Sequence, residues 1–479
     1  MKKTLYLLII TGLVIASCNK EFLDLKPISS FTSADYYKTR GDIEQAVTAC
    51  YNSLQSYYNR EASQLLNVRS DQAFHTNYDD KNIGDFTMTP ATGSFGGIWR
   101  NAYRGINLCN IVLSKQSDIQ MSDSARNQFI GEAKFIRALY YYHLVRVFGD
   151  VPVVKQPVDG TAALEYLRLP TDTVYNLIIS DLKDASSKLQ PQYSSVQTGR
   201  ATIWSAKGLL ASVYVTRKQW ALAKTALEEI ISSNKFDLLT TYASVFKLAN
   251  ENSKECLFSV DYKAGGIGTA NTLVGSSIPQ GVSQTVDPKY KNTGNAYALT
   301  ITDAYYNSFA ATDVRRNLTI ATSYPSSATV TVQTKFGIKY LDPTAQQSDG
   351  SSMNFIVQRY AEICLLYAEV LNELSYDASP TGNAWIYLNK TKVRAGLTAL
   401  TPTDLPNQIA FRNAVLDERN WEFGMEGIRW YDLIRSKTVE TAIINAKGIT
   451  VNTAKDYLFP VPLGEIQINP NLTQNPLYN

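Results

Sequence analysis

The stretch SDSARNQFIGEAKFIRALYYYHLVRVFGDVP, residues 122–152, decides the fold class. Ser122 is placed to cap the start of a helix, and Asp123 after it favours the positive end of the helix dipole. Apolar residues then recur every three or four positions and form one stripe, namely Phe129, Ala133, Ile136, Leu139, Tyr140, Leu144 and Val147. Gly149 and Pro152 end this pattern. The sequence therefore predicts a long helix between Ser122 and Gly149.

A second helical pattern runs over residues 201–232 and breaks near 217–219. Small and large residues follow each other there at the spacing of tetratricopeptide hairpins, namely Ala211, Tyr214, Ala223 and Leu227. Residues 43–57 and 360–374 are interpreted as parts of related hairpins. Their separations do not follow the 34-residue period of that repeat. We therefore expect an interrupted array of helical hairpins with long insertions.

The sequence pattern changes between Gly265 and Gly350. Turn-forming residues are frequent over 265–268 and 342–352, and helical periodicity is poor. We expect long loops and short strands laid over a helical scaffold in this part. Binding sites are usually built on such loops.

The N-terminus has the pattern of a lipoprotein signal peptide. Lys2 and Lys3 precede an apolar run over residues 5–17 that is shorter than the ~20 residues a spanning helix needs. The run ends Ile-Ala-Ser-Cys, which resembles the bacterial lipobox, so Cys18 is predicted to carry the lipid. The alternative is an ordinary secretory signal that happens to precede a cysteine.

Composition excludes several classes of protein. The 479-residue chain has 44% apolar and 19% charged residues and a formal net charge of +3, which suits a globular body and gives no basic field for nucleic acid. The remaining cysteines are Cys50, Cys109, Cys256 and Cys364, without metal-ligand spacing. They are interpreted as free thiols, although an oxidising compartment would allow a disulfide. His75 and His143 are too few for a zinc cluster, and His143 is interpreted as a core residue.

Several blocks, in order from residue 18 to the end of the chain, resemble the SusD/RagB family of lipoproteins. They are CNKEFLDLKP (18–27), EAKFIRALYY (132–141), FGDVP (148–152), RYAE (359–362), LYAE (366–369), ERNWEF (418–423), EGIRWYDLIR (426–435), LFPVP (458–462), NPNL (469–472) and QNP (474–476). One departure is Lys392, where family members often have arginine. Lysine keeps the charge and loses the bidentate fork, which is expected to alter a structural contact and not the function.

The resemblance implies a mainly α fold of tetratricopeptide-like hairpins with a loop-rich, mixed C-terminal half. The expected parts are a signal peptide (1–17), a lipid-anchored tether (18–40), a helical part (41–255) and a loop-rich and helical C-terminal part (256–479). It also implies a non-catalytic receptor at the outer face of the outer membrane, without a cofactor or metal. Such a receptor binds oligosaccharide and delivers it to a SusC-like TonB-dependent transporter. Some relatives take peptides instead.

Three acidic residues could be mistaken for catalytic groups. Glu418, Glu422 and Glu426 are spaced so that a helix would place them on one face, and glycoside hydrolysis uses paired carboxylates. We interpret them as structural, paired with nearby arginines, namely Arg412, Arg419, Arg429 and Arg435. A surface glycoside hydrolase is the less favoured alternative, because no nucleophile elbow, Walker loop or zinc-protease motif occurs.

The segment from Asn67 to Asn110 is the candidate ligand site. It combines aromatic rings, which stack on sugars, with polar groups that bind hydroxyls. The predicted contacts are Trp99, Asp71, Arg69, Asn101, Tyr78 and Phe95. For Trp99 the alternative is a helix-core anchor, with Tyr103 one turn further on. Tyrosines of the loop-rich part are weaker candidates, namely Tyr290, Tyr297, Tyr305 and Tyr306.

Overall fold

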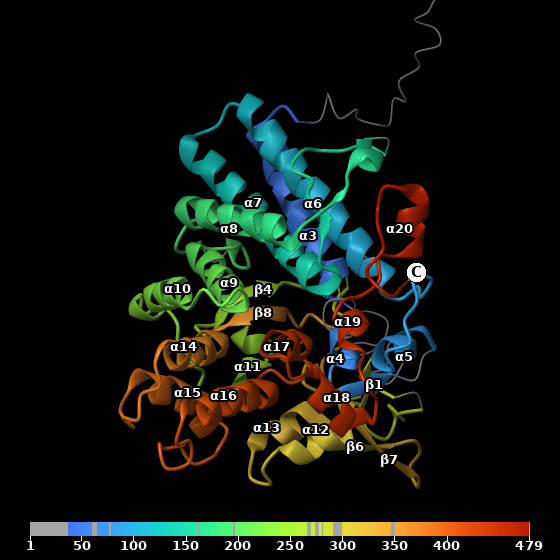
Figure 1. The fold of residues 1–479 in the computed structure, drawn as a ribbon, viewed down its shortest axis with the longest axis vertical. Helices are drawn as coiled ribbons and strands as arrows, with labels where there is room; N and C mark the ends of the chain where they lie inside the picture. The colour runs from blue at the N-terminus through green and yellow to red at the C-terminus, as the bar shows by residue number, and fades with distance from the viewer. Residues whose placement is uncertain are drawn as a thin grey trace, which may run out of the picture.

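The computed structural model describes residues 37–59, 65–75, 78–160, 162–194, 197–265, 270–273, 277–279, 281–290, 299–345 and 350–478. Cys18, the signal peptide and most of the expected tether lie outside these residues, as does Tyr297. Figure 1 shows long helices in the upper part of the molecule and shorter helices and strands below them.

Long helices packed side by side build the first half of the chain (Figure 1). They are α3 (Arg40–Tyr58), α6 (Gly96–Lys115), α7 (Asp123–Phe148), α8 (Thr171–Lys188), α9 (Ile203–Thr216) and α10 (Trp220–Ser232). Short elements lie between them, namely α4 (Leu66–Arg69), β1 (Ala73–His75), α5 (Tyr78–Gly84), η3 (Gln116–Asp118), β2 (Val151–Pro152), η4 (Ala162–Glu165) and β3 (Arg168–Leu169). Helix α7 packs against both α6 and α8.

The prediction for α7 is confirmed at both ends. The Ser122 hydroxyl accepts a hydrogen bond from the backbone N–H of Ala125, and the helix ends at Gly149, whose φ of 72° suits glycine. His143 is buried, and its Nε2 lies 2.6 Å from the hydroxyl of Tyr58. Burial, followed by the positive charge of Arg146, lowers the pKa of His143 well below its usual value. His143 is therefore a core residue, as predicted.

The predicted hairpin over 201–232 is also confirmed. Thr202 and Ser205 form a capping box at the start of α9, and the chain reverses at Lys218, which has a φ of 55°. Helix α10 then packs antiparallel to α9 (Figure 1). The small and large residues that match the tetratricopeptide spacing are all buried, namely Ala211, Tyr214, Ala223 and Leu227.

Strands are concentrated in the middle of the chain, where short strands were expected. The elements are α11 (Tyr242–Val245), η6 (Leu248–Asn250), β4 (Cys256–Val260), β5 (Leu299–Ile301), α12 (Asp303–Ser308), α13 (Val314–Thr319), β6 (Ile320–Pro325), β7 (Thr331–Gly337) and β8 (Phe355–Arg359). One antiparallel sheet has the order β1-β5-β7-β6, and β4 pairs with β8. In sheet β1-β5, Ala73 faces Ile301. The first sheet thus joins a strand from residues 73–75 to strands more than 200 positions later.

The last part of the chain is helical again. Its elements are α14 (Tyr360–Leu374), α15 (Asn383–Arg394), α16 (Gln408–Glu422), α17 (Arg429–Ser436), α18 (Val439–Lys447), α19 (Thr453–Asp456) and α20 (Leu463–Ile468). Helix α14 covers the predicted 360–374 and packs against α10, α15 and α16. The largest hydrophobic cluster includes residues from Ile43 to Tyr478, so one core crosses the expected boundary at residue 255.

Several further features of the described residues bear on function. Cys50, Cys109, Cys256 and Cys364 are free thiols. Within the described ranges, no three His, Cys, Asp or Glu side chains are grouped so that they could hold a metal ion. None of the helices in that part of the chain has both the length and the apolar character needed to cross a membrane.

Candidate functional site

Helix α6 forms one wall of a cleft of about 270 Å³, which we call the Trp99 cleft. Trp99, Tyr103 and Asn107 follow each other at intervals of four, so they lie on one face of the helix. The other walls are the segment 152–166 and residues 465–472, at the end of α20 and just after it. Three segments far apart in the sequence therefore meet at this cleft.

Aromatic rings form the inner wall of the Trp99 cleft. The Trp99 ring centroid lies 5.1 Å from that of Tyr103 and 5.1 Å from that of Phe148, which it meets edge to face. The Tyr103 hydroxyl donates to the Pro152 carbonyl at 2.8 Å. Trp99 is only 4% exposed, so it has no open face for a sugar to stack on. Its position fits the alternative of a core anchor, with Tyr103 one turn on.

The rim of the cleft is polar. The side chain of Arg100 is 62% exposed and lies 3.9 Å from the carboxylate of Glu465. Burial raises the pKa of Glu465, and Arg100 offsets part of this rise. The Asn469 amide donates to the carbonyl of Tyr166 at 3.0 Å, and the Asn107 side-chain oxygen accepts from a backbone N–H of the 152–166 segment at 3.0 Å. These bonds hold the walls in place.

Arg69 is fully buried and does not fit the expected role of a ligand contact. Its guanidinium donates to the backbone carbonyls of Ile83 at 2.9 Å and Asp456 at 2.6 Å. It also lies 3.7 Å from the centre of the Phe86 ring. Burial lowers its pKa to about 10. Arg69 thus ties α4 to α5 and to the C-terminal segment.

Phe95 and Asn101 also lie apart from the cleft. Phe95 has no exposed surface, and its ring packs edge to face on that of Phe459 at 5.8 Å. Asn101 is half-buried and does not line the cleft, because two residues along a helix turn the side chain by about 200° from Trp99. The side chain of Tyr78 lies outside the described residues.

Asp71 forms an ion pair with Arg429 that holds two parts of the chain together. Two guanidinium nitrogens of Arg429 lie 2.8 and 2.9 Å from the two carboxylate oxygens, which is bidentate geometry. The Thr302 hydroxyl donates to the backbone carbonyl of Asp71 at 2.6 Å. The pair is largely buried, so the carboxylate of Asp71 is already engaged.

The predicted contacts are therefore not gathered at one site. Of the predicted contacts whose side chains the structure describes, Trp99 alone lines the cleft. Tyr103, named in the sequence only as a neighbour of Trp99 in the helix core, lines it too, and the four-residue spacing between the two was the available signal. Arg100 is next to Trp99 in the sequence but was not among the predicted contacts. No local pattern in the sequence indicated that Tyr166 and Glu465 would line the cleft, because their segments approach α6 only in the folded chain. Among the weaker tyrosine candidates, Tyr290 and Tyr305 are buried and Tyr306 is half-buried.

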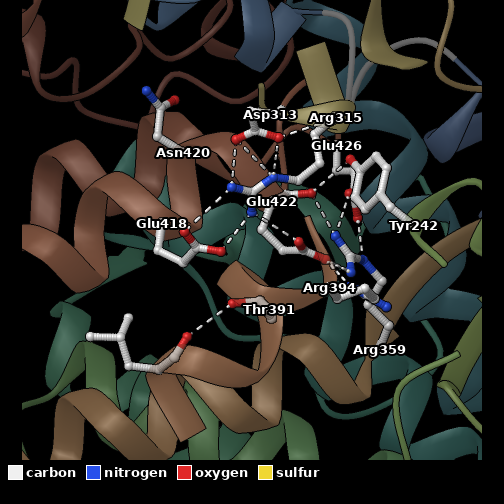
Figure 2. Close-up of polar contacts among 12 residues, drawn as sticks. Tyr242, Asp313, Arg315, Arg359, Thr391, Arg394, Glu418, Asn420, Glu422 and Glu426 are labelled. Carbon is white, nitrogen blue, oxygen red and sulfur yellow. Dashed lines mark hydrogen bonds and ion pairs between the residues drawn. The ribbon is translucent and has the colours of Figure 1, made fainter. Parts of the chain in front are cut away.

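The carboxylates of Glu418, Glu422 and Glu426 are buried in a network of opposite charges (Figure 2). Arg315 contacts Glu418 at 2.6 Å and Glu422 at 3.2 Å. Arg359 contacts Glu422 at 2.5 Å and Glu426 at 2.9 Å. The structural interpretation of these three acids is supported by their positions.

The network extends to further elements around α16. Arg394 of α15 contacts both Glu422 and Glu255, the latter at 2.6 Å. Lys339 contacts Glu426 at 2.5 Å, and burial lowers its pKa to about 8. Burial by itself would raise the pKa of Glu422, but Arg394, Arg359 and Arg315 outweigh it and hold this pKa well below the usual range. Glu422 is thus ionised and paired rather than poised to donate a proton.

The predicted partners of these acids were wrong. The four arginines near α16 pair with other carboxylates: Arg412 with Glu373, Arg419 with Asp432, Arg429 with Asp71, and Arg435 with Glu369 and Asp432. The expected common helix face was also wrong for one residue. Helix α16 ends at Glu422, and Met425, with a φ of 64°, turns the chain before Glu426.

Comparisons with known proteins cover the chain from near its start to its end. The model of the SusD family matches residues 283–478, and the model described as "Starch-binding associating with outer membrane" matches residues 21–215. A SusD-like protein from Formosa agariphila, P2, is 29% identical over 99% of both chains. A SusD-like protein from Bacteroides ovatus is 25% identical over 91% of this chain and 82% of its own length.

Solved structures share the fold. A SusD superfamily protein from Parabacteroides distasonis is 27% identical with a TM-score of 0.79, over 91% of this chain and 99% of that one. A laminarin-binding SusD-like protein is 24% identical with a TM-score of 0.79, over 92% and 100% of the two chains. The fold is mainly α, as predicted. Together, the two family models and the full-length SusD-like relatives show that the chain belongs to the SusD/RagB family.

Proposed function

We propose that this protein is a non-catalytic lipoprotein of the cell surface that captures oligosaccharide in the Trp99 cleft. In this proposal it delivers the sugar to a SusC-like TonB-dependent transporter in the outer membrane. The observation that carries the proposal is the cleft itself, in which partly exposed tyrosines stand beside polar groups from α6 and from residues 465–469. Rings that meet C–H faces and polar groups that meet hydroxyls are the two elements of sugar recognition.

The cleft supports a role for Tyr103 and Tyr166 as the surfaces that contact sugar. Both side chains are half-buried, in contrast to Trp99 behind them. Arg100 and Glu465 at the rim present a charged donor and an acceptor to sugar hydroxyls. Trp99 would then fix the orientation of Tyr103 instead of contacting the ligand. The predicted contribution of Trp99 to binding is thus indirect.

Relatives support the class of ligand. One solved relative is a laminarin-binding SusD-like protein, and another is a surface glycan-binding protein from Bacteroides thetaiotaomicron in complex with laminarihexaose. The absence of catalysis is supported by the ion pairs of Glu418, Glu422 and Glu426, whose carboxylates are buried and engaged by cations. The lipobox at Cys18 supports attachment to the membrane through lipid.

Residues 19–479, tested on a glycan array and then by calorimetry with the strongest binder, would test the proposal. Tyr166→Ala is expected to weaken binding by about 1 kcal/mol or more, roughly fivefold in Kd. Tyr387→Ala is the control, since Tyr387 is a half-buried tyrosine on α15 that does not line the cleft. Binding of no glycan, or equal effects of both variants, would contradict the cleft as the site. Release of shortened sugar on prolonged incubation would revive the hydrolase.

The proposed transporter is tested separately by mild-detergent pull-down at native expression. A large barrel protein is expected to co-purify, because a receptor at the outer surface has no route of its own for moving ligand inward. Recovery of the receptor alone would contradict the partnership. This outcome would leave the glycan-binding part of the proposal intact.

A further inference from the structure

A second cleft of about 330 Å³ lies on another part of the molecule, and we call it the Trp204 cleft. Its walls are residues 191–193 and 197–204, the latter leading into α9, residues 235–236 after α10, and residues 252–259 around the start of β4. It shares no lining residue with the Trp99 cleft. In Figure 1, α9 and α10 lie at the left of the molecule and α20 at the right.

An oriented aromatic ring lines this cleft. The indole Nε1 of Trp204 donates to the carbonyl of Pro191 at 3.1 Å. The ring meets that of Phe236 edge to face with centroids 6.3 Å apart, and the Lys207 ammonium lies 5.3 Å from it. Trp204 is nevertheless only half-buried. A half-exposed ring that is already fixed in orientation loses little conformational entropy when a ligand stacks on it.

Neutral polar side chains form part of the lining of the Trp204 cleft. Gln192, Gln197, Asn252 and Ser253 offer amide and hydroxyl groups. Amides both donate and accept, which suits sugar hydroxyls because these also do both. No Asp or Glu is among the lining residues that the structure describes.

The described lining of this cleft includes three cations, and two of them are paired with carboxylates outside it. Arg200 contacts Glu132 at 2.9 Å and Glu44 at 3.2 Å, and Lys254 contacts Asp237 at 3.3 Å. The third, Lys235, is exposed, and a single solvated ammonium selects only weakly for an anion. The chemistry of the cleft therefore favours an uncharged, hydroxyl-rich ligand over a phosphate, a sulfate or a uronate.

We infer that the Trp204 cleft is a second binding site for uncharged sugar units, distinct from the Trp99 cleft. Its volume lies within the range of ~300–1,000 Å³ typical of small-molecule sites. Two sites on one chain would let the protein hold one polysaccharide at two points, which strengthens binding of long chains more than of short ones. This inference rests on the proposed function of glycan capture.

Affinity electrophoresis tests the inference with the chain that lacks the signal peptide and the lipidated cysteine, residues 19–479. Native gels contain laminarin, starch, xylan, galactomannan or no polysaccharide, and Kd is taken from the retardation. Trp204→Ala is expected to raise Kd by about 5-fold in the gel that retards the wild type. Trp220→Ala is the matched control, since Trp220 begins α10 in the same hairpin, is half-buried and does not line the cleft.

A second variant guards against loss of folding in Trp204→Ala. Gln192→Ala combined with Gln197→Ala removes two amides from the cleft and leaves the Trp204–Phe236 contact in place. It is expected to raise Kd by about 3-fold, with an unchanged thermal midpoint. If a polysaccharide retards the wild type and neither variant changes Kd, the second site is overturned and the proposed function stands. If none of the polysaccharides retards the wild type, both the second site and the proposed function are overturned.

Discussion

The Nη1 atom of Arg315, on α13, lies 2.6 Å from the Oε1 atom of Glu418, on α16, although 103 positions separate the two residues. Both side chains are almost completely buried. Arg315 also contacts Asp313 at 2.7 Å, so its charge is shared by several carboxylates (Figure 2). A charge in such a place is stable only while its partners remain, because the low dielectric of the interior penalises an unpaired ion.

Arg315→Leu is therefore expected to lower the free energy of unfolding by about 3–5 kcal/mol, the usual cost of breaking a buried ion pair from one side. Urea titration followed by circular dichroism measures this. Arg412→Leu is the control, since Arg412 lies on α16, the helix of Glu418, but forms a partly exposed pair with Glu373, worth about 0–1 kcal/mol. Equal losses in both variants would contradict a special role for the buried network.

Stability is expected to fall on acidification because the pKa of Glu422 is depressed in the folded state. A carboxylate whose pKa is depressed by folding stabilises the folded state fully above its unfolded pKa, about 4.3. This stabilisation is lost as the pH falls through the folded pKa. Urea midpoints from about pH 6 down to pH 3 should thus decrease more steeply for the wild type than for Glu422→Gln, which cannot be protonated. Parallel decreases would place the acid sensitivity at other carboxylates.

Trp99→Ala is expected to act mainly on stability. Because Trp99 is 4% exposed and packs on Phe148, its removal leaves a cavity that costs about 3–5 kcal/mol. Trp99→Phe should cost less, since it keeps a ring in contact with Phe148. Differential scanning calorimetry gives both values. A folded Trp99→Ala protein with the wild-type midpoint but without glycan binding would instead identify Trp99 as a direct ligand contact.

Replacement of Cys18 by Ala is expected to release the protein from the membrane, because no other group would then carry the lipid. Cell fractionation and palmitate labelling of the wild type and the variant measure this directly. Protease treatment of intact cells should also degrade the wild type, if the lipoprotein is exposed at the outer surface. A variant that stays membrane-bound and labelled would disprove acylation at Cys18.

Local features of the sequence determined the helices. The cap at Ser122 and the stop at Gly149 act within one turn of the chain, and the stretch 360–374, interpreted as part of a helical hairpin, matches α14 from Tyr360 to Leu374. The break between the two helices near Lys218 was also predicted from the local sequence. Such signals are short-range, so they can be found without knowledge of the packing. The family resemblance, carried by motifs from both ends of the chain, supplied the overall architecture.

The tertiary structure alone decided how those motifs meet. Glu422 pairs with Arg315, Arg359 and Arg394 instead of the arginines nearer along the chain, because α13, β8 and α15 deliver these side chains into the interior while the nearer arginines point to other carboxylates. Trp99 is buried for a similar reason, since Phe148 of α7 packs on it from a different segment. Burial and ion pairing depend on the approach of elements tens to hundreds of positions apart, and no local pattern in the sequence specifies that approach.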